Sequence, residues 1–312
     1  GAYSTQGDMS SFGITILSGL FQGMLLFLVA SGLSLIFGLM DILNFAQGAY
    51  FMVGAYLAFD IMHPTGVIDL TTQIPDPNMR FIVGVIVALI VGGLLGIFLE
   101  RVLLRPLYSR PLFQLVLTFG VSIVMLEAIR SIWSTTPYAW VEGFTIRNAS
   151  FEFLGQSFGM YRLFVISVGI LLIILIALLL RFSRIGIIIR AGVEDPEMVS
   201  ALGIDVRAVF TLVFTLGCAV AAFGGAIAAP FLGATISMGN QFLIASIAVI
   251  VLGGLGSYEG TAIGRKRTGL ALSNMQQFSI VVNIPILATI TPMVLLMVVL
   301  LVRPRGLFGE AR

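Results

Sequence analysis

Long apolar segments recur along almost the whole chain and constrain its fold more than any other feature. A bilayer's hydrocarbon core is about 30 Å thick, so a spanning helix needs around 20 predominantly apolar residues. Segments of this kind predict eight transmembrane spans, at residues 14–38, 43–62, 81–103, 112–133, 161–180, 208–232, 241–257 and 281–302. A weaker apolar segment at 269–280 is predicted to form a short or re-entrant helix.

The composition supports this interpretation. The mean hydropathy is +1.07 and only 10% of residues are charged, whereas soluble domains have roughly 25%. The predicted spans are apolar on all sides, although a helix on the surface of a soluble core needs a polar face. We therefore expect an all-α polytopic transmembrane bundle of about eight to ten spans, with broken or re-entrant helices. Residues 1–312 are expected to form one transmembrane domain.

The basic residues predict the orientation in the membrane. Most of the 17 Lys and Arg residues fall within 101–110, 181–207, 265–267 and 303–312, whereas the segments 63–80 and 134–160 carry mainly acids. The positive-inside rule places the four basic groups in the cytoplasm. The 13 residues before the first span are then expected outside, and the last segment, 303–312, inside. This requires an odd number of crossings, so 269–280 is predicted to be a ninth.

Few residues are suited to catalysis or metal binding. The single cysteine, Cys218, excludes an intramolecular disulfide, and the single histidine, His63, leaves no His/Cys cluster with metal-ligand spacing. His63 precedes Pro64 and is interpreted as a loop residue. The only lysine, Lys266, lies outside any phosphate-binding G-x-x-x-x-G-K-[ST] motif, so any ATP hydrolysis is expected on another chain. No metal or cofactor is expected on this chain.

The most informative stretch is polar. Residues 181–207 form a long cytoplasmic connection in which Asp195 and Pro196 predict the start of a short helix, and Gly203 its end. One apolar face of this helix is formed by Met198, Ala201 and Leu202. Because nothing in the chain is predicted to cover this face, we expect it to dock into a groove of a partner protein.

This stretch resembles the coupling loop of ABC importer permeases. Residues 197–203, EMVSALG, fit the pattern E-A-A-x-x-x-G, although Met198 and Val199 replace its two alanines. The longer sequence RAGVEDPEMVSALGID is similar to that of the branched-chain amino-acid importer family, in which this helix docks into a cytoplasmic ATPase and transmits its closure. The resemblance implies these coupling residues: Glu194, Asp195, Pro196, Glu197, Met198, Ala201, Leu202 and Gly203.

Four further segments resemble motifs of the same family. They are DILNFAQG at 41–48, the E-R-x-x-x-R-P-L pattern at 100–107, the G-G-x-G-S turn at 253–257 followed by Gly260, and RPRGLF at 303–308. The short amino terminus favours the H-type subunit. One departure from the family is Arg265-Lys266-Arg267, where small apolar residues are usual. Because these charges would be costly at bilayer depth, we expect them at the cytoplasmic surface.

The resemblance implies a partner set and a location. The partners are a second permease (a similar chain or a second copy), two cytoplasmic ATPases that bind ATP and Mg²⁺, and an extracytoplasmic substrate-binding protein. The location is the bacterial inner membrane, and the solute is a branched-chain or other hydrophobic amino acid. An ion-coupled secondary transporter is the alternative function. A third possibility, an intramembrane enzyme, lacks a Ser/His, paired-Asp or metal constellation.

Polar residues within the spans are candidates for the solute pathway, because each is costly in lipid unless it faces protein or water. The candidates are Asn44, Gln47, Gln114, Thr118, Ser122 and Gln241, with Gln22 and Ser246 weaker. Asn44 and Gln47, three residues apart, are interpreted as sharing a helix face, where they either line the pathway or bond between helices. Gln114, Thr118 and Ser122 predict a polar stripe. Glu127 and Arg130 are expected to form a local ion pair.

Overall fold

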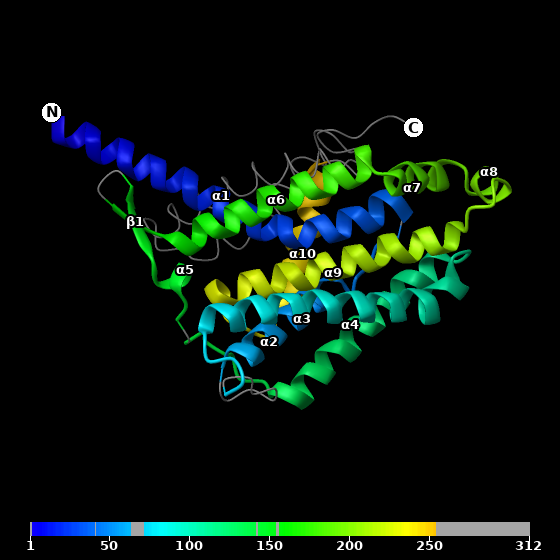
Figure 1. The fold of residues 1–312 in the computed structure, drawn as a ribbon, viewed down its shortest axis with the longest axis horizontal. Helices are drawn as coiled ribbons and strands as arrows, with labels where there is room; N and C mark the ends of the chain where they lie inside the picture. The colour runs from blue at the N-terminus through cyan, green and yellow to red at the C-terminus, as the bar shows by residue number, and fades with distance from the viewer. Residues whose placement is uncertain (1, 41, 64–71, 142, 154–155, 254–312) are drawn as a thin grey trace.

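The structure, a computed structural model, describes residues 2–40, 42–63, 72–141, 143–153 and 156–253. These residues form a bundle of long helices that run in the same general direction (Figure 1). The elements are α1 (Ala2–Met40), α2 (Gln47–Met62), α3 (Pro77–Phe98), the π-helix η1 (Leu99–Leu104), the 3₁₀-helix η2 (Arg105–Leu107), α4 (Pro111–Trp133), α5 (Thr145–Asn148), β1 (Ser150–Phe153), β2 (Gln156–Gly159), α6 (Met160–Phe182), α7 (Arg184–Glu194), α8 (Pro196–Ala201), α9 (Val206–Leu232) and α10 (Met238–Gly253).

The polytopic helical bundle expected from the sequence is confirmed. Among the described residues, five helical segments are long and apolar enough to cross a membrane: Leu17–Met40, Pro77–Leu107, Pro111–Trp133, Met160–Phe182 and Val206–Leu232. Each coincides with a predicted span. The predicted spans 43–62 and 241–257 correspond to α2 and α10, which have 16 residues each. The predicted segments 269–280 and 281–302 lie outside the described residues, as do the basic groups at 265–267 and 303–312.

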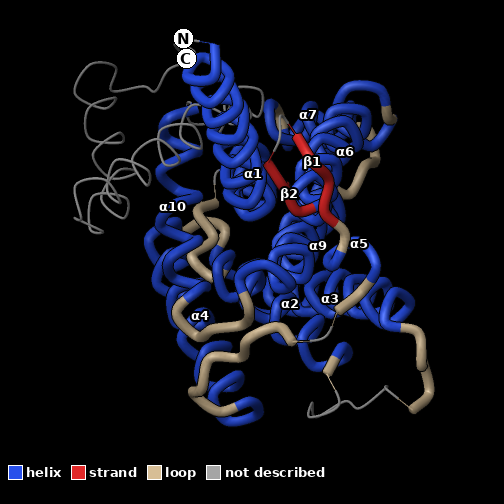
Figure 2. The backbone as a smooth tube through the Cα atoms, turned by 90° about the vertical axis from the view of Figure 1, so that its left-hand side faces the viewer, coloured by secondary structure: helices blue, strands red, loops and turns tan. Residues whose placement is uncertain are grey.

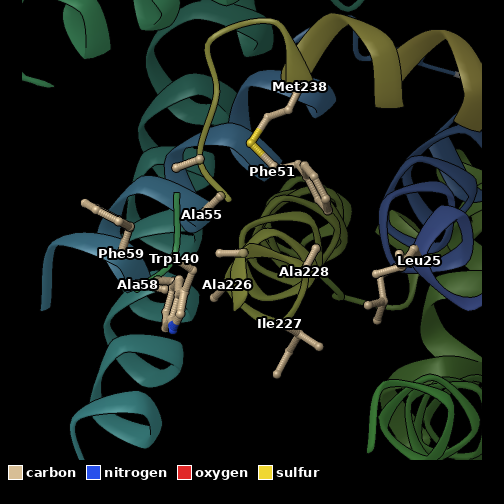
Figure 3. Packing of buried hydrophobic residues seen from close by; sticks show 14 of the residues in the cluster. Leu25, Phe51, Ala55, Ala58, Phe59, Trp140, Ala226, Ile227, Ala228 and Met238 are labelled. Carbon is tan, nitrogen blue, oxygen red and sulfur yellow. The ribbon is translucent and has the colours of Figure 1, made fainter. Parts of the chain in front are cut away.

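Helix α9 lies at the centre of the bundle. Viewed nearly end-on in Figure 2, it is surrounded by other helices, and its most extensive contacts are with α1, α2 and α3. Figure 3 shows Phe51 and Ala55 of α2 and Met238 of α10 gathered beside Ala226 and Ala228 of α9. Small residues on α9 let its neighbours approach closely, which is how helices pack in lipid, where apolar burial gives little driving force.

The closest approach is between α2 and α9. A Cβ atom added at Gly54 of α2 would lie 1.9 Å from the carbonyl oxygen of Ala222, and one added at Gly225 of α9 would lie 1.8 Å from that of Phe51. The two backbones are therefore in direct contact. A pair of neighbouring glycines such as Gly224 and Gly225 is typical of tight helix packing in membranes, and its surroundings agree with that interpretation.

The outer faces of α3, α4 and α6 are apolar and exposed, as expected of helices that contact lipid or another membrane subunit. In α4, for example, Leu112, Val116, Phe119 and Val124 are more than half exposed. Helix α2 is the opposite case, because all of its residues except Val53 are buried within this chain. The bundle therefore has an inner helix pair, α2 and α9, and an outer layer.

Small departures from regular α-helical structure occur within the described residues. An antiparallel hairpin pairs β1 with β2, with Ser150 opposite Gly159 and Phe153 opposite Gln156. A π-helix, η1, continues α3 before the chain turns into α4. Pro230, a residue type that can break a helix, lies within α9, which continues to Leu232. The Pro230 carbonyl accepts a hydrogen bond from Arg147 Nε at 3.1 Å.

The connections lie at two ends of the bundle. In Figure 1, α8 is at the right-hand end, and β1 and α5 are at the left-hand end. The turn from η2 into α4 lies at the same end as α8, since η1 contacts α9 close to the α8–α9 connection. The basic groups at 101–110 and 181–207 therefore share one end, as the charge pattern predicts.

Candidate functional site

The short helix predicted to begin at Asp195 and Pro196 is present, and local hydrogen bonds define both of its ends. At the start of α8, Asp195 Oδ1 accepts a hydrogen bond from the backbone N–H of Met198 at 2.9 Å, and Pro196 occupies the first turn. At its end, the N–H of Gly203 donates to the Ser200 carbonyl and that of Ile204 to the Val199 carbonyl. This pair of bonds is a Schellman motif. Gly203 has a φ of +82°, which a residue with a Cβ rarely adopts.

The side chains of α8 divide into an anchor and an exposed apolar surface. Val199 is buried and holds the helix against the chain, whereas Met198 is 64% exposed and Leu202 73% exposed. Ala201 and Glu197 are also exposed. The helix proper covers Pro196–Ala201, shorter than the expected 195–203, because the Schellman turn begins at Leu202. The predicted apolar face thus points away from the bundle. The side chains of Glu194 and Pro196 are not described.

Helix α8 is followed directly by the central helix. Asp205 Oδ1 accepts hydrogen bonds from the backbone N–H groups of Arg207, at 3.0 Å, and Ala208, at 3.4 Å, and so caps α9. Only the Gly203 turn separates this cap from α8. Helix α8 therefore lies next to the start of the helix against which α1, α2 and α3 pack.

Asn44 and Gln47 form one buried hydrogen-bonded group. The Asn44 side chain donates to Gln47 Oε1 at 3.2 Å, and Gln47 Nε2 donates to the Gly217 carbonyl of α9 at 2.9 Å. The expectation that both residues share a helix face is wrong for Asn44, which precedes α2. Its Oδ1 accepts from the backbone N–H of Ala46 at 3.1 Å, and this local turn competes with the helix.

Replacing Asn44 by alanine is expected to lower the free energy of unfolding by about 1–2 kcal/mol, because the N–H of Ala46 would lose its acceptor and Gln47 Oε1 its donor. The shift in melting temperature in detergent measures this loss of stability. Ser131→Ala is the matched control, since its hydroxyl is exposed and bonds only to the Ala128 carbonyl in the same helix. An unchanged melting temperature together with altered solute preference would instead assign Asn44 to the pathway.

The polar stripe predicted on α4 is present and buried. Gln114, Thr118 and Ser122 face inward along this helix. Gln114 Nε2 donates to the Leu107 carbonyl at 2.8 Å, and Thr118 Oγ1 accepts from the N–H of Phe45 at 3.2 Å. Gln114 therefore links α4 to η2, and Thr118 links α4 to the segment before α2. Whether the stripe also lines a pathway stays a prediction.

The remaining predicted residues are scattered. Gln241 is exposed, Gln22 is partly buried, and Ser246 is buried with its hydroxyl bonded to the Leu243 carbonyl at 2.8 Å. His63 is the C-terminal cap of α2, where Nδ1 lies 2.9 Å from the Phe59 carbonyl and Nε2 accepts from the N–H of Val141. Among the described residues, no group of three or more His, Cys, Asp or Glu is arranged to hold a metal.

A cavity of about 450 Å³ lies between the end of α4 and the start of α10, at the end of the bundle opposite α8. It is lined by Leu126, Arg130, Thr135, Pro137, Thr235, Ile236, Ser237 and Asn240. Arg130 makes the predicted ion pair with Glu127, at 2.6 Å. The pathway residues predicted from the sequence are absent from this lining within the described part of the chain.

Comparison with known proteins gives the family. A family model described as the permease component of branched-chain amino acid transport systems matches residues 15–302. The chain belongs to this family. The permease is 29% identical over 293 residues to LivH of Salmonella typhimurium, with 91% of each chain covered. It is 30% identical over 305 residues to BraD of Pseudomonas aeruginosa, with 95% of each covered. Both relatives are named as high-affinity branched-chain amino acid transport system permease proteins.

An archaeal relative and a solved structure are also similar. The probable permease LivH of Methanocaldococcus jannaschii is 28% identical over 297 residues, with 91% of this chain and 89% of that one covered. The solved structure is PsaBC from Streptococcus pneumoniae in complex with Fab, with a TM-score of 0.47, 13% identity and coverage of 92% of this chain and 91% of that one. The family and its named relatives favour the permease function over an ion-coupled carrier.

Two buried acids of the permease were not among the predicted site residues. Asp60 lies in the last turns of α2 and accepts a hydrogen bond from Trp133 Nε1 at 3.0 Å. Glu100 was noted only as part of a motif, yet it is fully buried within η1. An acid inside an apolar segment is a signal for functional residues in membrane proteins. That signal was available for both, but their proximity to the predicted span ends obscured it.

Proposed function

We propose that this chain is a permease subunit of an ATP-driven importer that moves a branched-chain or similar hydrophobic amino acid into the cytoplasm. The observation that carries the proposal is α8, a capped helix outside the spanning segments whose Met198 and Leu202 side chains are mostly exposed. An exposed apolar pair on a short, ordered helix suits insertion into a groove of a partner. The names of the relatives support the class of solute.

The proposed mechanism is alternating access driven from α8. Two cytoplasmic ATPases bind ATP and Mg²⁺, and their closure displaces the docked α8. The Gly203 turn and the Asp205 cap pass this displacement to α9. Because α9 packs directly on α1, α2 and α3, the inner part of the bundle follows and opens the pathway to the other side. This chain binds and orients the solute, and the partner ATPases hydrolyse ATP.

The proposal includes an orientation and a set of partners. The α8 end of the bundle carries the basic groups at 101–110 and 181–207 and faces the cytoplasm of a bacterial inner membrane. The end with β1, β2 and the cavity near Arg130 faces outward, where a substrate-binding protein delivers the solute. A second permease, either a similar chain or a second copy, completes the pathway.

Reconstitution in proteoliposomes tests this proposal. Vesicles that contain this permease with its partner permease and ATPases, and the binding protein on the substrate side, are expected to take up labelled leucine only when ATP is supplied to the ATPase side. The control is the same complex with a non-hydrolysable ATP analogue. Leucine uptake driven by a proton or sodium gradient in vesicles without ATPases would contradict the proposal.

A further inference from the structure

Glu100 occupies an unusual place at the end of α3. It lies in η1, a six-residue π-helix that joins α3 to the 3₁₀-helix η2. A π-helix holds an extra residue in one turn, and such insertions are frequent at functional sites. The Glu100 side chain is 0% exposed, although a buried carboxylate is costly unless it is paired and hydrogen-bonded.

Three neighbouring groups compensate for the buried charge. Thr211 Oγ1 of α9 donates to Glu100 Oε2 at 2.6 Å, and the Tyr108 hydroxyl donates to Oε1. Arg105 Nε lies 3.9 Å from Oε1. Burial raises the pKa of Tyr108, and its bond to Glu100 raises it further, so this hydroxyl stays protonated and remains a donor. Glu100 thereby joins α9 to the segment that leads into α4.

The bond between Thr211 and Glu100 is suited to opening and closing. A threonine hydroxyl has a single proton to donate. Thr211 Oγ1 also lies 2.9 Å from the Arg207 carbonyl one turn earlier in α9, which is a second acceptor for that proton. When Thr211 leaves Glu100, its hydroxyl therefore keeps a partner within its own helix. The cost of breaking this link between two helices is reduced accordingly.

The position of Thr211 connects this link to the coupling segment. Thr211 lies six residues after Asp205, so it is about 9 Å along α9 from the helix cap that follows α8. A movement of α8 that shifts or rotates the start of α9 therefore reaches Thr211 before it reaches the glycine contacts deeper in the bundle. On the other side of the link, η1 and η2 lead within a few residues to Pro111, where α4 begins.

We propose that Glu100 is a positioning residue for transport, which links α9 to η1 through Thr211 and passes the movement of α8 to α3 and α4. The link is closed in the conformation described here. It carries the first part of the displacement of α9 to η1, and it opens only afterwards, when the Thr211 hydroxyl turns to the Arg207 carbonyl. The inference rests on the proposed function, since it assigns a route for the movement that the ATPases deliver. It adds a defined hydrogen bond whose loss uncouples ATP hydrolysis from transport.

Thr211→Val in the complete reconstituted complex tests this inference. Valine has nearly the shape of threonine without the hydroxyl. We expect the number of leucine molecules moved per ATP hydrolysed to fall by about tenfold, the effect typical of losing one hydrogen bond to a charged group. Thr211→Ser, which keeps the hydroxyl, is expected to retain the wild-type ratio. Tyr108→Phe, which removes the other donor, is expected to lower the ratio in the same direction.

The readout separates positioning from folding. The ratio is measured per hydrolysed ATP on complexes that have passed size-exclusion chromatography, so a reduced yield of folded protein does not change it. A wild-type ratio in both Thr211→Val and Tyr108→Phe, even with a lowered melting temperature, would overturn the inference and leave Glu100 a purely structural role. Failure of the wild-type complex to link uptake to ATP would instead contradict the proposed function.

Discussion

Gly225→Val is expected to leave no folded permease. In the structure, the carbonyl oxygen of Phe51 lies 1.8 Å from where the first side-chain atom of residue 225 would be, and the Ala55 nitrogen lies 3.0 Å away. Backbone atoms cannot turn aside as a flexible side chain can, so α2 and α9 would have to separate. Overpacking of this kind costs at least 1–3 kcal/mol in a well-packed core, and here it affects the two innermost helices.

The measurement is the yield of monodisperse protein in mild detergent by fluorescence-detected size-exclusion chromatography. Gly120→Val is the matched control, because Gly120 is also in a spanning helix and nothing lies within 4 Å of its added Cβ. The control is expected to elute like the wild type, whereas Gly225→Val elutes in the void volume or is absent. A monodisperse Gly225→Val protein with normal stability would show that α2 and α9 do not pack as described.

Gly54 provides an independent check of the same contact from the other helix. A side chain there would meet the Ala222 carbonyl at 1.9 Å. Each of the two glycines is therefore required because the backbone of the opposite helix occupies the space that its side chain would need. The sequence indicated tight packing from the run of small residues around Gly224 and Gly225. It did not indicate the partner, because a helix of small residues can pack against any other helix in the bundle. The pairing with α2 depends on the tertiary structure.

The spans themselves were predictable because lipid imposes one simple requirement on them. A long apolar segment must be helical to satisfy its own backbone, and each described span coincides with a predicted one. The segment before α2 was predictable only in part. Its hydropathy continues that of α2, yet Asn44 folds back on the N–H of Ala46 and delays the helix to Gln47. Hydropathy does not register such a local polar contact.

The polar residues show more clearly that the sequence predicts local features and misses contacts between distant segments. The inward-facing stripe of Gln114, Thr118 and Ser122 followed from helical spacing alone, and the structure confirms that these residues share a buried face. The Glu100–Thr211 bond could not be predicted, because its partners are 111 residues apart and η1 interrupts the regular helical spacing. For α8, both caps were readable, since Asp195, Pro196 and Gly203 act through local backbone geometry.

The double replacement of Met198 and Leu202 by aspartate is expected to abolish binding of the ATPases and to reduce ATP-driven uptake to background. These two side chains are the large apolar groups that α8 exposes, at 64% and 73%. Two carboxylates in an apolar groove would each lose hydration without gaining a partner, a cost of several kcal/mol. Each 1.4 kcal/mol weakens binding about tenfold, so the complex is expected not to survive purification.

The folded permease should be unaffected by this double replacement, because both side chains point away from the bundle and Val199 remains to anchor α8. Co-purification of the ATPases with the tagged permease gives the binding result, and its melting temperature gives the fold. Met79→Asp is the control, because Met79 is a 55% exposed apolar residue at the opposite end of the bundle. If the double variant retained its ATPases and its uptake, the energy of transport would have to enter the permease at a surface other than α8.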